Sequence, residues 1–204
     1  MLEHGGTAPG SAPCRQASHV GSAGAGIADS GDAGTVHDGL RHCLPRHDWG
    51  GEINAMEDQS SVDQEFFVRY AQLAALSPMM QFSVLPSRVL DETHYRAVRN
   101  AVETREQMMP VILGLAGEST RSGEPVIRPL AYEDASLADI TDQFMLGSDY
   151  VVAPVLEKGA TVRSVTLPDG SWQQLGTEGD PIGGRQTITV PVTLETLQVF
   201  ERVR

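Results

Sequence analysis

The chain has 204 residues, a net charge of −12 and 40% hydrophobic residues. Because the negative charge is spread along the chain, it argues against a partner built on a phosphate backbone, and we expect no nucleic-acid binding. No apolar run reaches the ~18 residues of a membrane span, and residues 1–30 lack the basic start and apolar core of a secretory signal. The sequence therefore predicts no membrane association and leaves the compartment open, with the cytoplasm favoured.

Composition divides the chain near Trp49. Before that residue there is no Phe, Tyr or Trp, and the segment holds five of the six His and both Cys, Cys14 and Cys43. Such a segment cannot bury enough apolar surface to offset the entropy lost on ordering, so residues 1–48 are predicted to be a disordered leader. The His and Cys residues have no regular ligand spacing, and we predict neither a metal ion nor another cofactor.

A first helix is expected over residues 61–76, where apolar side chains recur on one face. Ser60 or Ser61 is the expected N-cap, and Pro78 is expected to stop the helix. The stretch 79–90 is apolar but is interrupted by Pro86, which is typical of a loop pressed against a core.

Residues 92–119 keep a helical spacing of apolar side chains, which predicts a long second helix. Pro110 lies inside it and removes one backbone donor, so we expect a kink or a break there. A short strand is expected at Val126–Leu130.

After Gly147 the pattern changes to period two. Four stretches are strand candidates, at residues 149–156, 161–175, 185–192 and 197–203, and Pro168-Asp169-Gly170 has the chemistry of a turn. The fold class is therefore α/β and then all-β, in two units joined near Gly147.

Two sequence segments are more informative about fold and function than the composition is. They are "DQEFFVRYAQLAALSPMMQFS" at 63–83 and "GEPVIRPL…DQFMLGSDYVVAPVLEKGATVRSVTLPDGSW" between 123 and 172. Together they resemble the C-terminal part of glycoside hydrolase family 31, which contains retaining α-glucosidases, α-xylosidases and some α-galactosidases. The resemblance covers residues 50–204. The wording "GGEINAM…MMQFS" looks most similar to a branch that includes the myogenesis-regulating glycosidase and bacterial relatives.

The resemblance implies a (β/α)8 barrel followed by a proximal β-sandwich. On that map, residues 49–147 are an incomplete C-terminal fragment of the barrel, and Val126–Leu130 is its eighth strand. Residues 148–204 are the sandwich. The order of helices and then strands agrees with this map.

The same resemblance implies where the chemistry lies. Retaining glycosidases use two carboxyl groups about 5–5.5 Å apart, as nucleophile and as acid/base. The family carries them on the fourth and sixth barrel strands, which precede the "GGE" region, and no such motif is found before Asp48. A full barrel takes ~250 residues. We therefore predict no catalytic residue in this chain and no glycosidase activity from it alone, with an α-glycoside as the ligand of the intact parent enzyme.

Three residues are candidates for substrate binding in that parent. Gln81 and Ser83 lie where many family members carry Arg-Asn-His, whose His contacts sugar, although neither Arg nor His is present here. The alternative for Gln81 is a hydrogen bond that anchors its loop. Arg128 stands at the C-terminal end of the implied eighth strand, the catalytic face of a barrel. Its alternative role is a structural ion pair with Glu133 or Asp142.

Other polar and aromatic candidates favour structural roles. Asp48 and Glu52 are interpreted as solvated rather than as an acid/base pair. Trp172 could stack on a sugar, but a Trp in a strand is more often in the core. Glu157 and Lys158 are most simply a solvated pair.

The leader has two interpretations: a real extension, or the product of a shifted reading frame. One consistent choice of codons for residues 39–51, read one nucleotide later, gives Gly-Phe-Ala-Thr-Ala-Cys-Pro-Asp-Met-Ile-Gly-Gly. That string resembles the seventh-strand region of the family. We expect a frameshifted start, and the nucleotide sequence of the gene would decide between the two.

Two functions remain in competition. The first is a fragment of a retaining α-glycosidase that is inert alone and self-associates through exposed barrel surfaces. The second is a non-catalytic β-sandwich module that binds carbohydrate or a protein partner. A third, weaker possibility is complementation by a separately encoded upstream half.

Overall fold

A computed structural model describes residues 62–82 and 84–204. The predictions for the leader and for Asp48 and Glu52 fall outside these residues. Ser83 also lies outside them. Within the described ranges, no helix combines the length and the apolar character needed to cross a membrane.

The first described helix, α2 (Gln64–Ala75), lies within the predicted range. Its N-cap is Asp63, whose carboxylate accepts a hydrogen bond from the backbone N–H of Phe66 at 3.1 Å. The predicted serine cap is therefore wrong, because the helix starts later than the apolar periodicity suggested. Asp63 satisfies a free backbone donor and also places a negative charge at the positive end of the helix dipole.

The long helix α4 (Glu92–Ser122) begins at the N-cap Asp91 and ends at Gly123, which adopts a left-handed conformation with φ 84°. The helix runs through Pro110, so of the kink or break expected there, the break does not occur. Met108 and Ile112, on either side of the proline, are both buried in one apolar cluster, and this packing holds the helix together. The short helix α3 (Pro86–Val89) starts at the proline that was expected to interrupt a loop.

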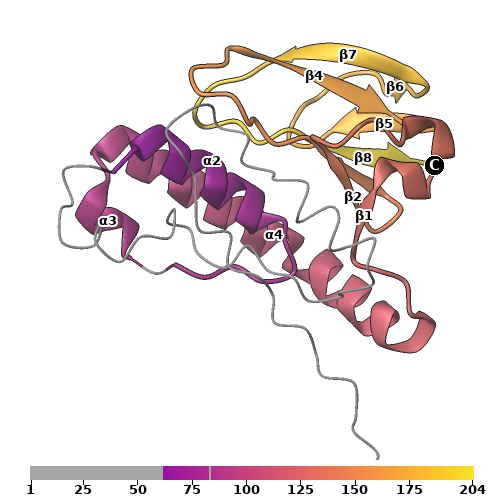
Figure 1. Cartoon of the computed structure of the whole chain (residues 1–204), viewed down its shortest axis with the longest axis horizontal. Helices are drawn as coiled ribbons and strands as arrows, with labels where there is room; N and C mark the ends of the chain where they lie inside the picture. Colours follow the sequence, from indigo (N-terminus) through magenta and orange to yellow (C-terminus); the bar gives the residue numbers. More distant parts are fainter. Residues whose placement is uncertain (1–61, 83) are drawn as a thin grey trace, which may run out of the picture.

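Helices α2 and α4 pack side by side (Figure 1) around a cluster that includes Phe67, Val68, Ala97 and Val98. The residues between them fold back over the same cluster. Met80, Phe82, Val84 and Leu90 are partly buried against it. The prediction of a loop pressed against a core is confirmed for these residues.

Arg105 of α4 caps the C-terminus of α2. Its guanidinium donates to the carbonyls of Ala74 (3.3 Å), Ala75 (2.9 Å), Ser77 (2.7 Å) and Pro78 (3.2 Å). The last carbonyls of a helix have no i+4 donor within the helix. The carbonyl of Ala74 also accepts from the N–H of Ser77 at 3.1 Å, and for the other three carbonyls Arg105 is the donor that is observed. The contact fixes the end of α2 against the middle of α4.

Eight strands form the second half of the described chain. They are β1 (Ile127–Pro129), β2 (Phe144–Leu146), β3 (Tyr150–Val152), β4 (Val162–Leu167), β5 (Ser171–Gln174), β6 (Ile182–Gly183), β7 (Gln186–Pro191) and β8 (Val199–Val203). One sheet has the order β1-β2-β3-β8-β5-β6, and β4 pairs with β7 in a second sheet. Every pairing is antiparallel. Two 3₁₀ turns, η3 (Leu130–Tyr132) and η4 (Ala135–Leu137), lie between β1 and β2.

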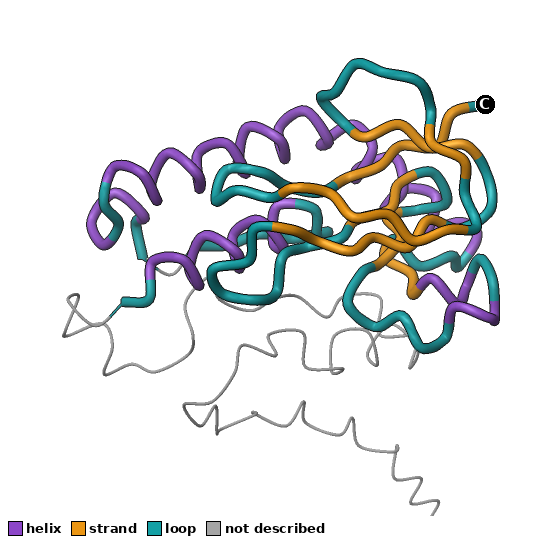
Figure 2. The backbone as a smooth tube through the Cα atoms, turned by 90° about the horizontal axis from the view of Figure 1, so that it is seen from above, coloured by secondary structure: helices purple, strands orange, loops and turns teal. Residues whose placement is uncertain are grey.

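The six-stranded sheet is covered on both faces (Figures 1 and 2). Val151 and Phe200 are register partners and belong to the core shared with β4 and β7. Their chain neighbours Val152 and Val199 are also register partners, and they pack on the opposite face with buried residues of α4. Successive strand residues point to opposite faces, so a strand buried on both sides is apolar throughout rather than alternating.

The sheet does not break at Gly147, where two units were expected to join. β1 and β2 precede that residue and β3 follows it, yet all three belong to one sheet. β1 lies within the predicted Val126–Leu130 strand, but its described neighbour is the antiparallel β2, and it forms the outer edge of the sheet. The division into a barrel part and a sandwich part therefore stays a prediction.

Two buried polar residues attach α2 to the strand layer. Arg69 and Gln72 are 5% and 2% exposed. Arg69 Nη1 donates to the carbonyl of Thr193 at 2.9 Å, and Gln72 Nε2 donates to that of Leu194 at 2.8 Å. These bonds join the helix to the β7–β8 connection, so the helices and strands form one packed body.

We expect Arg105→Met to lower the free energy of unfolding by about 2–4 kcal/mol, because four carbonyls lose a charged donor at once. Urea titration followed by circular dichroism would measure this. Arg99→Met on the same helix is the matched control, since Arg99 makes only an exposed ion pair with Glu103, and its effect should stay within about 0.5 kcal/mol. Equal effects of the two changes would contradict the capping role.

We expect Gly184→Ala to destabilise the protein by about 3 kcal/mol or more. A Cβ there would lie 1.9 Å from the backbone oxygen of Pro168, which cannot move aside as a side chain could. Gly114→Ala is the control: a Cβ there meets nothing within 4 Å, and the site is helical. That change should stabilise by about 0.5–1 kcal/mol. Melting temperatures that move in the same direction would contradict this account.

Candidate functional site

Arg128 lies in a compact polar cluster at the end of β1. Its Nε donates to the carbonyl of Pro125 at 3.0 Å, its Nη2 lies 3.7 Å from Glu124, and its guanidinium is 5.1 Å from the ring centre of Tyr132. The hydroxyl of Tyr132 donates to the same oxygen of Glu124. The predicted ion pair therefore forms, but with Glu124.

The two partners predicted for Arg128 are engaged elsewhere. Glu133 pairs with Arg202 at 3.2 Å, and Asp142 pairs with Arg163 at 2.6 Å. The sequence could not distinguish these carboxylates, because each choice depends on which strands become neighbours. A role for Arg128 in substrate binding stays a prediction.

Gln81 lies exposed in the loop between α2 and α3. Its side chain makes no hydrogen bond to any residue of the described ranges, so the anchoring bond proposed as its alternative role is not observed there. Its expected neighbour in the sugar subsite, Ser83, lies outside the described residues. The contacts observed for Arg128 do not include Gln81, and a shared substrate site of Gln81, Ser83 and Arg128 stays a prediction.

Trp172 is fully buried, as expected for a strand Trp in a core. Its indole Nε1 donates to the carbonyl of Pro168 at 2.9 Å, and the guanidinium of Arg202 lies 4.4 Å from its ring centre. Its ring is therefore not available to stack on a sugar. Lys158 pairs at 2.5 Å with Asp63, not with Glu157 as expected.

Among the described residues, the carboxyl groups with shifted pKa values are all shifted downward. Hydrogen bonds from His94 lower the pKa of Asp91, and hydrogen bonds from Ser136 lower that of Asp134. The hydrogen bond from Arg185 lowers the pKa of Asp169. Partial burial raises the pKa of Asp63, but the hydrogen bonds from Lys158 and the Phe66 N–H outweigh it. A glycosidase acid needs the opposite shift.

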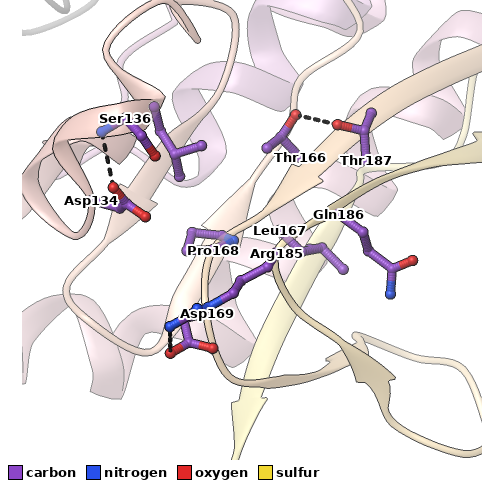
Figure 3. A pocket seen from close by; sticks show the side chains of 10 residues that line it. Asp134, Ser136, Thr166, Leu167, Pro168, Asp169, Arg185, Gln186 and Thr187 are labelled. Carbon is purple, nitrogen blue, oxygen red and sulfur yellow. Dashed lines mark hydrogen bonds and ion pairs between the residues drawn. The ribbon is translucent and has the colours of Figure 1, made fainter.

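The described residues also enclose an open groove where β4 ends and β7 begins (Figure 3). Three segments line it: 134–137 around η4, 166–169 at the end of β4, and 185–187 at the start of β7. Its volume is about 500 Å³. Its lining combines three apolar residues, called the floor below, with seven polar ones, called the rim. The floor consists of Leu137, which is partly exposed, and of Leu167 and Pro168, which are buried. The rim consists of Asp134, Ser136, Thr166, Asp169, Arg185, Gln186 and Thr187.

Backbone hydrogen bonds hold two walls of the groove together. The N–H of Arg185 donates to the carbonyl of Leu167 at 2.9 Å, and the N–H of Gly184 donates to that of Gly170 at 2.7 Å. Gly184 has no room for a side chain, because the backbone of Pro168 lies against it. The turn after β4 and the start of β7 therefore form one preformed edge.

Arg185 adopts an unusual backbone conformation on this edge. It is the non-glycine residue with positive φ among those described, at 57°. Its guanidinium lies 2.8 Å from Asp169 Oδ2, and both side chains stay largely exposed, at 74% and 69%. Beside them, the hydroxyls of Thr166 and Thr187 lie 3.0 Å apart across the β4–β7 pair.

The charge of the groove follows from its ionised groups. Hydrogen bonding to Asp169 raises the pKa of Arg185, while the pKa values of Asp134 and Asp169 are lowered. At neutral pH, two carboxylates and one guanidinium leave one net negative charge. Within the described residues, no group of three His, Cys, Asp or Glu could hold a metal ion. The groove therefore offers hydrogen-bond donors and acceptors beside an apolar floor.

Comparisons with known proteins identify the C-terminal part of the chain. Residues 123–203 match the model for the glycosyl hydrolase family 31 C-terminal domain. The chain is 38% identical over 120 residues to the myogenesis-regulating glycosidase of Mus musculus, covering 57% of this chain and 17% of that protein. It is 35% identical over 155 residues to the SITS-binding protein of Tetronarce californica, covering 72% of this chain and 22% of that protein. The chain thus spans about a fifth of the length of these relatives.

Solved structures agree with the sequence comparison. A family 31 dextranase of Flavobacterium johnsoniae in complex with isomaltotriose superimposes with a TM-score of 0.63 and 29% identity, covering 68% of this chain and 18% of that one. A family 31 α-xylosidase from a soil metagenome, in complex with xylose, gives 0.62 and 29%, covering 68% and 25%. Over residues 123–203, the chain therefore belongs to glycosyl hydrolase family 31 and carries its C-terminal domain.

Proposed function

We propose that this chain is the non-catalytic C-terminal part of a retaining α-glycosidase, and that it supports the catalytic part rather than performing the reaction. The observation that carries the proposal is the state of its carboxyl groups. The shifted ones are held in the ionised form by neighbouring donors. None of these four can serve as the proton donor that glycoside cleavage requires.

The ion pairs support the same interpretation. Asp142 is bound by Arg163 through both its carboxylate and its backbone carbonyl, each at 2.6 Å. Glu124 is shared between Arg128 and Tyr132. In each carboxylate, the oxygen that contacts the neighbouring side chains holds chain segments together, which is a structural role.

The size of the relatives is consistent with a supporting role. The myogenesis-regulating glycosidase and the SITS-binding protein are matched over 17% and 22% of their lengths. We infer that the substrate-contacting carboxylates of the intact enzyme belong to a part not represented by the described residues. The ligand of that enzyme would be an α-glycoside, since the solved family 31 relatives are a dextranase bound to isomaltotriose, an α-linked oligosaccharide, and an α-xylosidase bound to the monosaccharide xylose.

A surface for the rest of the enzyme is present on α4. Val102, Met109, Leu113 and Ala116 fall at helical spacing on one stripe, and these four residues belong to none of the core clusters of the described chain. Leu113 is 61% exposed. We propose that this α4 stripe packs against the catalytic part in the intact enzyme, and that it causes self-association when that part is absent.

The competing function is a free-standing module that binds carbohydrate or a protein partner. One observation favours it: the six-stranded sheet has both faces covered within the chain, so the fold needs no other polypeptide to complete its central core. The two functions differ in what they predict for the α4 stripe and for hydrolysis.

We expect the purified chain to release no product from an aryl α-glucoside or an aryl α-xyloside, because the described carboxyl groups with shifted pKa values are all held ionised by neighbouring donors. Release of the aryl group would be followed spectrophotometrically beside an enzyme-free blank. Turnover well above that blank would refute the proposal if it persists after further purification and in a second expression host.

We expect the chain to self-associate and to bind a hydrophobic dye, and Leu113→Glu to reduce both by placing a charge in the α4 stripe. Sedimentation velocity and dye fluorescence would measure this. Val162→Glu is the control, because Val162 is similarly exposed, at 57%, but lies on β4. A monomer that melts cooperatively and binds no dye would favour the free-standing module instead.

A further inference from the structure

We propose that the groove between η4, the end of β4 and the start of β7 binds a neutral polyhydroxylated ligand, such as a short oligosaccharide. This goes beyond the proposed function, since it concerns binding by this chain itself and needs no hydrolysis. The site is the groove of Figure 3.

The lining has the two components that such a ligand requires. A pyranose ring presents apolar C–H groups on its faces and hydroxyls around its edge. Leu137 is partly exposed and supplies the accessible apolar surface of the groove, while Leu167 and Pro168 behind it are buried and make this wall rigid. Burial of C–H groups against Leu137 would release water from both surfaces.

The rim supplies the complementary polar groups. The carboxylates of Asp134 and Asp169 can each accept hydrogen bonds from hydroxyl groups, and a carboxylate has two oxygens for neighbouring hydroxyls. Arg185 can donate, because its ion pair with Asp169 uses one of its five N–H groups in the contact that is observed. Hydrogen bonds to charged groups are stronger than those between neutral groups.

The charge decides which class of ligand fits. The net negative charge of the groove disfavours phosphorylated and other anionic ligands. A cation would find Asp169 already paired with Arg185 at 2.8 Å. A neutral ligand that both donates and accepts hydrogen bonds matches this lining better than either ion.

The conformation of Arg185 is an independent reason to assign a ligand here. A glycine would adopt φ 57° without strain, as Gly147 does at 60°. The exposed ion pair of Arg185 with Asp169 adds little stability, so the ion pair does not account for a strained arginine at this position. Strain of this kind is typical of positions where a side chain serves binding.

The test is saturation-transfer difference NMR on the full chain with isomaltotriose, and with glucose 1-phosphate as the anionic probe. We expect transfer to isomaltotriose with a dissociation constant of about 1 mM, and weaker transfer to glucose 1-phosphate. Absence of transfer to isomaltotriose at about fifty times that concentration would overturn the site. Stronger transfer to glucose 1-phosphate would overturn the neutral class.

Arg185→Gly is the decisive variant, because glycine relieves the strained φ while removing the guanidinium. We expect about tenfold weaker binding with a melting temperature equal to or above that of the unchanged chain. Arg99→Ala is the matched control, since Arg99 also makes an exposed ion pair but on α4, at 3.4 Å from Glu103, and it should leave binding unchanged. Equal transfer with Arg185→Gly, or an equal loss with Arg99→Ala, would overturn the assignment.

The outcome is separable from that of the proposed function. Turnover of an α-glycoside would contradict the supporting role and leave the binding result as it stands. Absence of binding would contradict the groove and leave the absence of turnover as it stands.

Discussion

The central constraint on this molecule is that its six-stranded sheet is apolar on both faces. Val151 and Phe200 need a cover on one side, and Val152 and Val199 need one on the other. The β4–β7 pair supplies the first cover and α4 supplies the second. If either face were open to water, several fully buried side chains would become exposed. Burial of each such side chain stabilises the fold by about 1.5–3 kcal/mol. The helices and strands therefore depend on each other, although they follow one another in the sequence as if they were separate units.

This dependence explains the polar contacts between the layers. Arg69 and Gln72 are almost fully buried, so each must find a hydrogen-bond partner or lower stability. Their partners are backbone carbonyls of Thr193 and Leu194, in the connection between β7 and β8. Within the helical layer, Arg105 likewise donates hydrogen bonds to backbone carbonyls, at the end of α2. Buried polar side chains thus set how the elements are arranged, while apolar burial supplies most of the driving force.

Sequence patterns predicted where the helices and strands lie better than they predicted which elements and side chains contact one another. Apolar periodicity located α2, α4 and most of the strands within a few residues, because each depends on its own local pattern. Of the kink or break expected at Pro110, the break does not occur, because tertiary packing on both sides of a proline is not visible in a local rule. Assigning Arg128 to Glu133 or Asp142 was also wrong. Sheet topology brings those two carboxylates to Arg202 and Arg163, which are distant in sequence, while Arg128 pairs with Glu124, four residues before it.

The candidate groove shows the same limit. The turn at Pro168-Asp169-Gly170 was recognisable from its residues, yet nothing in it indicates that residues 134–137 and 185–187 lie against it. The signal that could have indicated this edge is the pair Gly183-Gly184 followed by Arg185. The two glycines predict a turn, and Arg185 directly after them adopts the positive φ that glycine usually takes. Membership of glycosyl hydrolase family 31 was predictable, because two long strings carry it and the family model covers residues 123–203.

One hydrogen bond has a practical consequence. The indole N–H of Trp172 donates to the carbonyl of Pro168 at 2.9 Å, and Pro168 is also part of the groove floor. The excited indole is sensitive to charges and dipoles at its nitrogen, so a change in the hydration of that carbonyl alters the light that Trp172 emits. The sandwich thus has an intrinsic fluorophore bonded to the inner side of its groove. Because the chain has two Trp residues, replacement of Trp49 by Phe would make that emission report on this one place.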